Sequence, residues 1–255
     1  MHVFTEKPGD LLSADAHKII KHRYEVAAKY SQDKSVLEVG VGQAIGSQRI
    51  AKVASSYVGG EYSTENIDLI RNKGLNQNFI QVNAHYLPFH DNSFDLVLAL
   101  AMVYYLKFDI FINEVKRILK PNGKLLFCTS NGNVPGFIPA PFTTEYYSIP
   151  ELNRKLNKHG FQCKFYGAFP RFNKYVVIVK LKVFIRDAIK LIIRFIHNGD
   201  KIWIYYKNKS LGGLVALPNR VEEIEYDDYR NQHFAMLADN EINEQYRVIY
   251  CVAQR

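Results

Sequence analysis

The sequence predicts an α/β fold: a doubly wound, mostly parallel sheet of seven strands, with an inserted helical segment before the last strand. Between residues 35 and 127, short apolar runs alternate with longer amphipathic stretches, which is typical of strands and helices around a parallel sheet. A glycine-containing turn follows the first apolar run. The 255 residues are 47% hydrophobic and 23% charged, and they contain no uncharged apolar stretch long enough to predict a membrane span.

The alternating region supplies five strands and three helices. The expected strands are Ser35–Val39, Ser56–Glu61, Phe79–Val82, Phe94–Ala99 and Lys124–Cys128. The expected helices are Ala44–Ala54, Ser63–Lys73 and Asp109–Leu119. Gly74 ends the second helix and Pro121-Asn122-Gly123 ends the third, because glycine and proline interrupt helices.

Elements on both sides complete the predicted core. One helix, about Ala14–Tyr30, precedes the sheet, and another, Pro150–Lys158, follows it. Two further strands, Phe161–Phe165 and Tyr246–Val252, are expected to pair as neighbours. We therefore expect a core of residues 1–170 and 244–255, interrupted by an insertion of residues 171–243.

Net charge, cysteine content and the first residues of the chain bear on the binding partner and on the cellular compartment. The net charge is +8, which attracts polyanions of any kind and selects none of them. Three cysteines, Cys128, Cys163 and Cys251, are too few and too scattered in the sequence to predict a disulfide framework or a metal site. The first residues lack the basic start and apolar core of a signal peptide, so we expect a cytoplasmic protein.

A glycine turn and a distant acid indicate a nucleoside site. Gly40, Gly42 and Gly46 follow the first strand with the spacing G-x-G-x-x-x-G, one residue longer than the dinucleotide fingerprint, which counts against a nicotinamide cofactor. Glycines let backbone N–H groups approach a ligand closely. Glu61 ends the second strand about twenty residues after Gly40, where such folds place an acid that accepts hydrogen bonds from ribose hydroxyls.

Further motifs follow in order along the chain. Asn83 and Ala84 end the third strand, and the segment Leu87-Pro88-Phe89-His90-Asp91-Asn92-Ser93-Phe94-Asp95 leads into the fourth. With the glycine turn and the segment from Asn113 to Gly123, this pattern resembles the class I S-adenosylmethionine-dependent methyltransferases, specifically the small-molecule group with L-P-F-x-D-N-S-F-D. The resemblance covers roughly Tyr24 to Phe165.

The resemblance implies S-adenosylmethionine as the cofactor, S-adenosylhomocysteine as its product, a Rossmann-like fold and a set of contact residues. The glycine turn would line the methionine part, and Glu38 would orient that turn or its ammonium group. Glu61 would hold the ribose diol. The remaining cofactor contacts implied by the resemblance are Tyr24 as part of a lid, Tyr62 against the adenine, Asn83, Ala84, His85, Leu100 and Tyr105. Asn83 departs from the usual Asp, but an amide oxygen also accepts the adenine amino group.

The catalytic residue stays open, with Tyr105, Glu145 and His85 as candidates. Because a sulfonium cofactor carries its own leaving group, in-line positioning supplies most of the catalysis, roughly 7 to 11 kcal/mol from proximity and orientation. A base adds to this where the acceptor is an alcohol or phenol. Two interpretations of Tyr105 stay open. We expect it either to contact the methionine part or the acceptor, or to cover the core together with Tyr104.

The insertion contains a basic amphipathic stretch, Tyr175–Ile196, in which Arg186, Lys190 and Arg194 recur every four residues opposite isoleucines. Two interpretations stay open. The stretch forms the roof of the acceptor pocket and pairs with the acidic segment Glu222–Asp228, or it lies in an anionic membrane surface.

The leading functional hypothesis is an S-adenosylmethionine-dependent methyltransferase that acts on a small-molecule or saccharide-type acceptor, with transfer to oxygen. One alternative is methylation of a lipid or lipid-linked acceptor by an enzyme in peripheral contact with the inner membrane face. Another is a non-catalytic cofactor-binding or regulatory subunit. Nucleic-acid methylation is disfavoured, because the chain lacks an N-P-P-Y-type motif after the fourth strand and its basic residues alternate with aliphatic ones.

Overall fold

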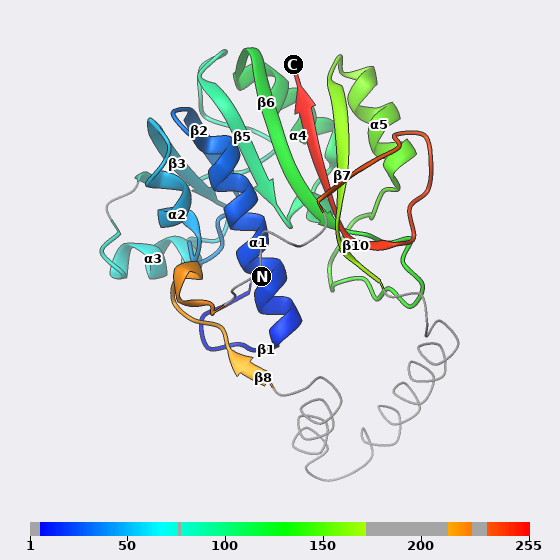
Figure 1. Cartoon of the computed structure of the whole chain (residues 1–255). Helices are drawn as coiled ribbons and strands as arrows, with labels where there is room; N and C mark the ends of the chain where they lie inside the picture. The colour runs from blue at the N-terminus through cyan, green and yellow to red at the C-terminus, as the bar shows by residue number, and fades with distance from the viewer. Residues whose placement is uncertain (1–5, 76–77, 172–213, 226–233) are drawn as a thin grey trace.

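A computed structural model describes residues 6–75, 78–171, 214–225 and 234–255. An eight-stranded sheet with the order β4-β3-β2-β5-β6-β10-β7-β9 forms its centre (Figure 1). The strands are β2 (Ser35–Val39), β3 (Ser56–Glu61), β4 (Asn78–Gln81), β5 (Phe94–Leu100), β6 (Leu119–Ser130), β7 (Gln162–Pro170), β9 (Ala235–Leu237) and β10 (Tyr246–Gln254). The first five in chain order pair in parallel, and β10, β7 and β9 join antiparallel. The predicted doubly wound, mostly parallel sheet is therefore confirmed.

The sheet has one strand more than predicted. The eighth strand, β9, lies on the edge beside β7 and comes from the region that was expected to be an insertion. Its three residues are too few to display an alternating pattern, which explains why the sequence did not reveal it. The expected pairing of the last two core strands is confirmed, because β10 pairs with β7 over most of its length.

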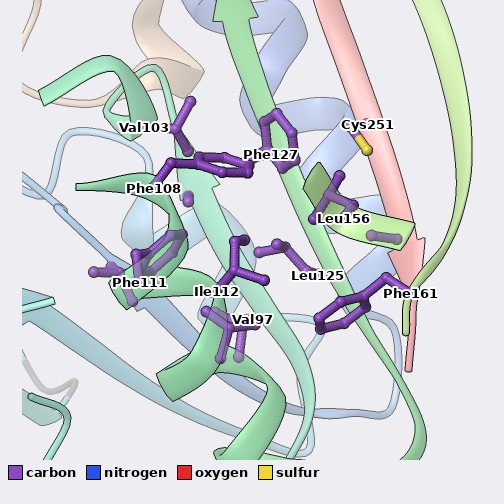
Figure 2. Packing of buried hydrophobic residues seen from close by; sticks show 14 of the residues in the cluster. Val97, Val103, Phe108, Phe111, Ile112, Leu125, Phe127, Leu156, Phe161 and Cys251 are labelled. Atoms are coloured by element: carbon purple, nitrogen blue, oxygen red, sulfur yellow. The ribbon is translucent and has the colours of Figure 1, made fainter. Parts of the chain in front are cut away.

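Helices cover both faces of the sheet. On one face, α4 (Phe108–Ile118) and α5 (Ile149–Lys158) bury their apolar sides in a core cluster with β5, β6, β7 and β10, part of which is shown in Figure 2. On the other face, α1 (Ala14–Ser31) and the short α2 (Ser47–Ala51) pack with the opposite sides of the strands. The central strands are buried on both faces, which is why β5 is apolar at nearly every position.

The helix after the glycine turn is shorter than predicted. It was expected from Ala44 to Ala54, but α2 begins only at Ser47 and ends at Ala51. Ala44 has φ +59°, in the left-handed region, so the turn continues past the glycines before a right-handed helix begins. The next helix, α3 (Thr64–Asn72), lies close to its predicted position.

A capping box begins α5: the Ser148 N–H donates to a carboxylate oxygen of Glu151 at 2.8 Å. Cys163 and Cys251, which are distant in the sequence, lie on the neighbouring strands β7 and β10, where Cys163 faces Ala253 and Cys251 faces Phe165. All three cysteines are free thiols.

A two-stranded ribbon attaches the segment 214–225 to the N-terminal region. β1 (Leu11–Ser13) pairs antiparallel with β8 (Leu214–Ala216), and Val221 donates its N–H to the Ile45 carbonyl in the glycine turn at 2.8 Å. This described part of the expected insertion therefore packs on α1 and on the glycine turn. The basic stretch Tyr175–Ile196 and the last three residues of the acidic segment lie outside the described residues. Within the described parts, no helix has the length and apolarity to cross a bilayer.

Candidate functional site

The glycine turn leaves β2 at the carboxyl edge of the sheet with a backbone that only glycine adopts easily. Gly40 and Gly42 have φ values of +76° and +57°. The Gly40 N–H donates to the Gly60 carbonyl at 2.7 Å, which fixes the turn against β3. A Cβ added to Gly40 would lie 3.1 Å from Cγ of Met102, so a larger residue is disfavoured by both conformation and space.

Gly46 serves a different purpose from the other two glycines. The ring of Tyr24, which is buried on α1, lies directly against it, so a Cβ at position 46 would overlap ring atoms. Tyr24 was predicted to be part of a cofactor lid. The structure places it over the last glycine of the turn, where it packs the N-terminal helix onto the site.

Glu61 joins the end of β3 to the glycine turn. Its Oε2 accepts a hydrogen bond from the Gly42 N–H at 2.8 Å, and its Oε1 accepts one from the Ser63 N–H at 2.9 Å. The side chain is buried, with the residue 4% exposed. The structure therefore brings together the acid and the glycine turn that the sequence predicted to form one site.

Glu38 is a buried carboxyl below the turn. The residue is 1% exposed, and a single oxygen, Oε2, accepts hydrogen bonds from the hydroxyls of Ser47 and Tyr57. Its other oxygen, Oε1, has no hydrogen-bond partner among the described residues. Burial raises the pKa of Glu38 from 4.5 to about 7, against the opposing effect of the two hydroxyls and of the Arg23 charge.

The raised pKa of Glu38 predicts a pH-dependent loss of stability. The folded state binds the Glu38 proton more tightly than the unfolded state. Ionisation of buried Glu38 therefore does not lower the free energy of unfolding below about pH 4.5, and it lowers it by the full amount above about pH 7. Relative to Glu38→Gln, the free energy of unfolding of the wild-type protein should fall by about 3 kcal/mol across this interval. Urea unfolding of both proteins at a series of pH values measures the difference.

Two buried histidines, His17 and His22, have lowered pKa values and are present in both proteins. Burial lowers the pKa of His22, which shares a hydrogen bond with the Tyr250 hydroxyl, to about 4. Because the folded state binds the His22 proton more weakly than the unfolded state, the free energy of unfolding falls as the pH falls from 6.5 to 4, whereas Glu38 lowers it as the pH rises. The effect of His22 is the same in both proteins, so it cancels when their pH profiles are compared. Parallel pH profiles for the wild type and Glu38→Gln would contradict the assignment.

The residues predicted to contact the adenine follow two neighbouring strands: Tyr62 comes directly after β3, and Asn83, Ala84 and His85 come after β4. Asn83 uses its Oδ1 to accept the His85 N–H at 2.9 Å, and Ala84 is buried beside it. Tyr62 is 57% exposed. His85 accepts the Lys107 N–H at its Nε2 at 2.9 Å, and burial lowers its pKa, so the neutral ring supports the start of α4.

Four aromatic residues, Tyr104, Tyr105, Phe137 and Tyr146, form a cluster of contacting rings. Tyr104 and Tyr105 belong to the 3-10 turn η1 (Val103–Tyr105), shortly after Leu100, the buried last residue of β5. The rings of Tyr104 and Tyr146 stack with centroids 4.8 Å apart, and Phe137 meets Tyr146 edge-on at 4.7 Å. The cluster therefore joins η1 to the loop that follows β6.

The candidate bases are in different environments. Burial raises the pKa of Tyr105, so its hydroxyl keeps its proton at neutral pH. The Nε2 of His85 is occupied by the Lys107 N–H. Glu145 is exposed and hydrogen-bonds Tyr147, whose pKa is raised chiefly by burial. None of the three candidates is both buried and free of hydrogen-bond partners, as a general base would be.

Several residues of the site have no signal in the sequence. Ser47 and Tyr57 hold Glu38, and Met102 covers Gly40. Arg23 belongs to the segment His22-Arg23-Tyr24, which resembles an Arg-Tyr pair of the same family, but its burial on α1 and its ion pair with Glu6 were not predicted. Most of these contacts join residues at least 17 positions apart, and the residue types alone do not indicate them.

Comparison with known proteins bears on the same region. Residues 37–127, about a third of the chain, match the methyltransferase domain family. The chain is 33% identical over 132 residues to a fatty-acid O-methyltransferase of Mycolicibacterium smegmatis, covering 49% of this chain and 43% of that protein. It is 34% identical over 114 residues to a probable phthiotriol/phenolphthiotriol dimycocerosates methyltransferase 2 of Mycobacterium ulcerans, covering 42% and 43%. The matches therefore span less than half the length of each relative.

A solved structure extends the likeness over nearly the whole chain. A SAM-dependent methyltransferase from Thermotoga maritima superposes with a TM-score of 0.52 at 15% identity, covering 94% of this chain and 93% of that one. At this identity the likeness concerns the fold. The chain therefore has the Rossmann-like α/β fold of S-adenosylmethionine-dependent methyltransferases, and its match to the methyltransferase domain family includes both the glycine turn and Glu61.

Proposed function

We propose that this protein is an S-adenosylmethionine-dependent methyltransferase that transfers a methyl group to an oxygen of a small-molecule acceptor. One observation supports this most directly: the Glu61 carboxylate at the end of β3 accepts the N–H of Gly42, in the left-handed turn at the end of β2. Acid and turn meet at the carboxyl edge of an open α/β sheet, where such folds bind nucleosides.

The residues present fit the cofactor. The backbone of Gly40 and Gly42 lines the methionine part, and the Glu38 oxygen without a described partner suits its ammonium group. Glu61 accepts the ribose hydroxyls, and Tyr62, Asn83 and Ala84 border the adenine. When bound, the sulfonium supplies both the methyl group and the leaving group.

The chain's own residues then orient the acceptor and exclude water. The aromatic cluster supplies an apolar wall beside η1, and the Tyr105 hydroxyl donates a hydrogen bond to the acceptor. A wall of this kind favours an apolar, lipid-like acceptor, and the fatty-acid and dimycocerosate names of the two relatives support the same class. We therefore place a lipid-like acceptor ahead of a saccharide.

The chemistry of the site favours a carboxylate as the accepting group. The three base candidates are a neutral histidine held by a backbone N–H, a tyrosine that stays protonated and an exposed glutamate. A fatty-acid carboxylate is already ionised at neutral pH, so its oxygen attacks without losing a proton to the protein. Methyl transfer then depends on alignment alone.

The pH dependence of turnover tests the carboxylate acceptor. With dodecanoate and saturating S-adenosylmethionine, kcat should vary less than about threefold between pH 7 and 9, because no proton has to be removed. A phenol or alcohol acceptor activated by a base would show a rate that rises with pH. Transfer of a radiolabelled methyl group to dodecanoate, a phenol and a saccharide compares the classes. Binding of S-adenosylmethionine without turnover on any of them would contradict the proposed enzyme activity.

A further inference from the structure

A buried tyrosine of β3 reaches Glu38 on the neighbouring strand β2. In the parallel pairing of the two strands, Glu38 lies opposite Gly59, and Tyr57 lies two positions earlier on β3. Tyr57 is 7% exposed, and its hydroxyl donates a hydrogen bond to Oε2 of Glu38. A phenol is thus fixed beside the carboxyl group that the ammonium group of the cofactor is proposed to meet.

The path of the Tyr57 side chain depends on the missing side chain of Gly59. A Cβ added to Gly59 would lie 3.2 Å from the Tyr57 hydroxyl oxygen and 2.5 Å from Cδ1 of Phe79. The Phe79 ring, on β4, meets the Tyr57 ring edge-on with centroids 6.1 Å apart. Gly59 therefore leaves the space through which the hydroxyl reaches Glu38, and Phe79 supports the ring in this direction.

Both hydrogen bonds to Glu38 converge on the same oxygen. The hydroxyl of Ser47, at the start of α2, also donates to Oε2, at 3.1 Å. Oε1 is buried and has no hydrogen-bond partner among the described residues. An unpaired buried acceptor is costly, so a partner at Oε1 would be stabilising. The two hydroxyls thus fix the orientation of the carboxyl group and leave one oxygen for a donor that the described residues do not supply.

The protonation state of Glu38 depends on the same hydrogen bonds. Burial raises the pKa of Glu38 to about 7, while the hydrogen bonds from Tyr57 and Ser47 and the charge of Arg23 act in the opposite direction. The charge of Glu38 also acts on Tyr24 of α1, and burial raises the pKa of both tyrosines, so they stay protonated. An ammonium group at Oε1 would favour the ionised form of Glu38.

We propose that Tyr57 is a positioning residue of the cofactor site: its hydroxyl holds one oxygen of Glu38 and leaves the other oxygen for the ammonium group of S-adenosylmethionine. The inference rests on the proposed function. Without this hydroxyl, Glu38 loses a fixed orientation and holds its proton more tightly, and a protonated carboxyl group no longer pairs with an ammonium group through its charge. Tyr57→Phe should therefore weaken the binding of ligands that carry an ammonium group and spare ligands that lack it.

Titration calorimetry on the full chain compares S-adenosylmethionine with 5′-methylthioadenosine, a nucleoside without the ammonium and carboxylate groups. Tyr57→Phe should weaken S-adenosylmethionine binding about five- to tenfold at pH 6 to 7 and less than about twofold at pH 8.5, because one hydrogen bond to a charged group corresponds to about a tenfold change in the ionisation equilibrium. The affinity for 5′-methylthioadenosine should change less than about twofold throughout. Tyr250→Phe, which removes a buried hydroxyl bonded to His22, is the matched control and should leave both affinities unchanged.

The number of protons released on binding separates positioning from a loss of packing. Because pairing with the ammonium group ionises Glu38, the wild-type protein should release about half a proton per S-adenosylmethionine bound at pH 7. Calorimetry in buffers of different ionisation enthalpy measures this number. Tyr57→Phe should release close to one proton, and Glu38→Gln gives the background from the amine of the ligand itself.

The outcomes distinguish the inference from the proposed function. Equal weakening of both ligands by Tyr57→Phe, or a proton release equal to that of the wild type, would overturn the inference. Circular dichroism checks that each variant folds, and Ser47→Ala, which removes the other donor to Oε2, should raise the proton release in the same way and serves as the test if Tyr57→Phe does not fold. Failure of the wild-type protein to bind S-adenosylmethionine would instead contradict the proposed function.

Discussion

Glu61→Ala should lower the affinity for S-adenosylmethionine at least about 100-fold. Hydrogen bonds to a charged group contribute about 1.5 to 3 kcal/mol each, and the loss of two ribose contacts corresponds to this factor or more. The change also removes the acceptor for the Gly42 and Ser63 N–H groups, so the glycine turn loses its support from β3. Titration calorimetry with S-adenosylmethionine measures the effect.

A nearby acid provides the control for Glu61. Glu65 lies in the first turn of α3 and is exposed, so Glu65→Ala removes the same charge without touching the glycine turn. Its affinity should stay within about twofold of the wild type. An affinity of Glu61→Ala within threefold of the wild type, with circular dichroism unchanged, would show that the nucleoside binds elsewhere.

Gly46→Ala should lower the free energy of unfolding by about 2 to 4 kcal/mol. The added Cβ would overlap the Tyr24 ring, and Tyr24 is buried between α1 and the sheet, so either the ring or the turn has to shift. The backbone of Gly46 has φ −116°, which alanine adopts readily, so the cost comes from packing. Thermal and urea unfolding of the variant measure it.

A double-mutant cycle separates packing from other effects at Gly46. Tyr24→Ala alone should cost about 3 to 5 kcal/mol, because it leaves a cavity. In that background Gly46→Ala should cost less than about 1 kcal/mol, since the overlapping ring is gone. An equal cost of Gly46→Ala in both backgrounds would contradict the packing role of this glycine.

The central sheet could be predicted because each of its parallel strands has a recognisable pattern within a few consecutive residues. Strands such as β2 and β5 are buried on both faces and appear as short apolar runs between amphipathic helices. The ribbon of β1 with β8 and the edge strand β9 were not predicted. Three residues show no periodicity, and pairs such as Leu11 with Ala216 depend on contacts across most of the chain.

The same distinction applies to the site. Gly42 and Glu61 were predicted together, because a fixed spacing along alternating strands and helices brings them to one edge. The bond of His85 to Lys107 and the pair of Arg23 with Glu6 depend on side-chain directions in the folded molecule. No pattern of spacing encodes such contacts, so the sequence could propose His85 as a base but could not reveal its engagement with α4.

The position of β10 has a consequence for biosynthesis. This strand lies between β6 and β7 and is hydrogen-bonded to both, yet the ribosome makes it after every other strand of the sheet. During translation, β6 and β7 each have no partner on the side that β10 later occupies until residues 246–254 have emerged. Until then the nascent chain exposes two unpaired strand edges, and such edges are prone to aggregation unless chaperones protect them.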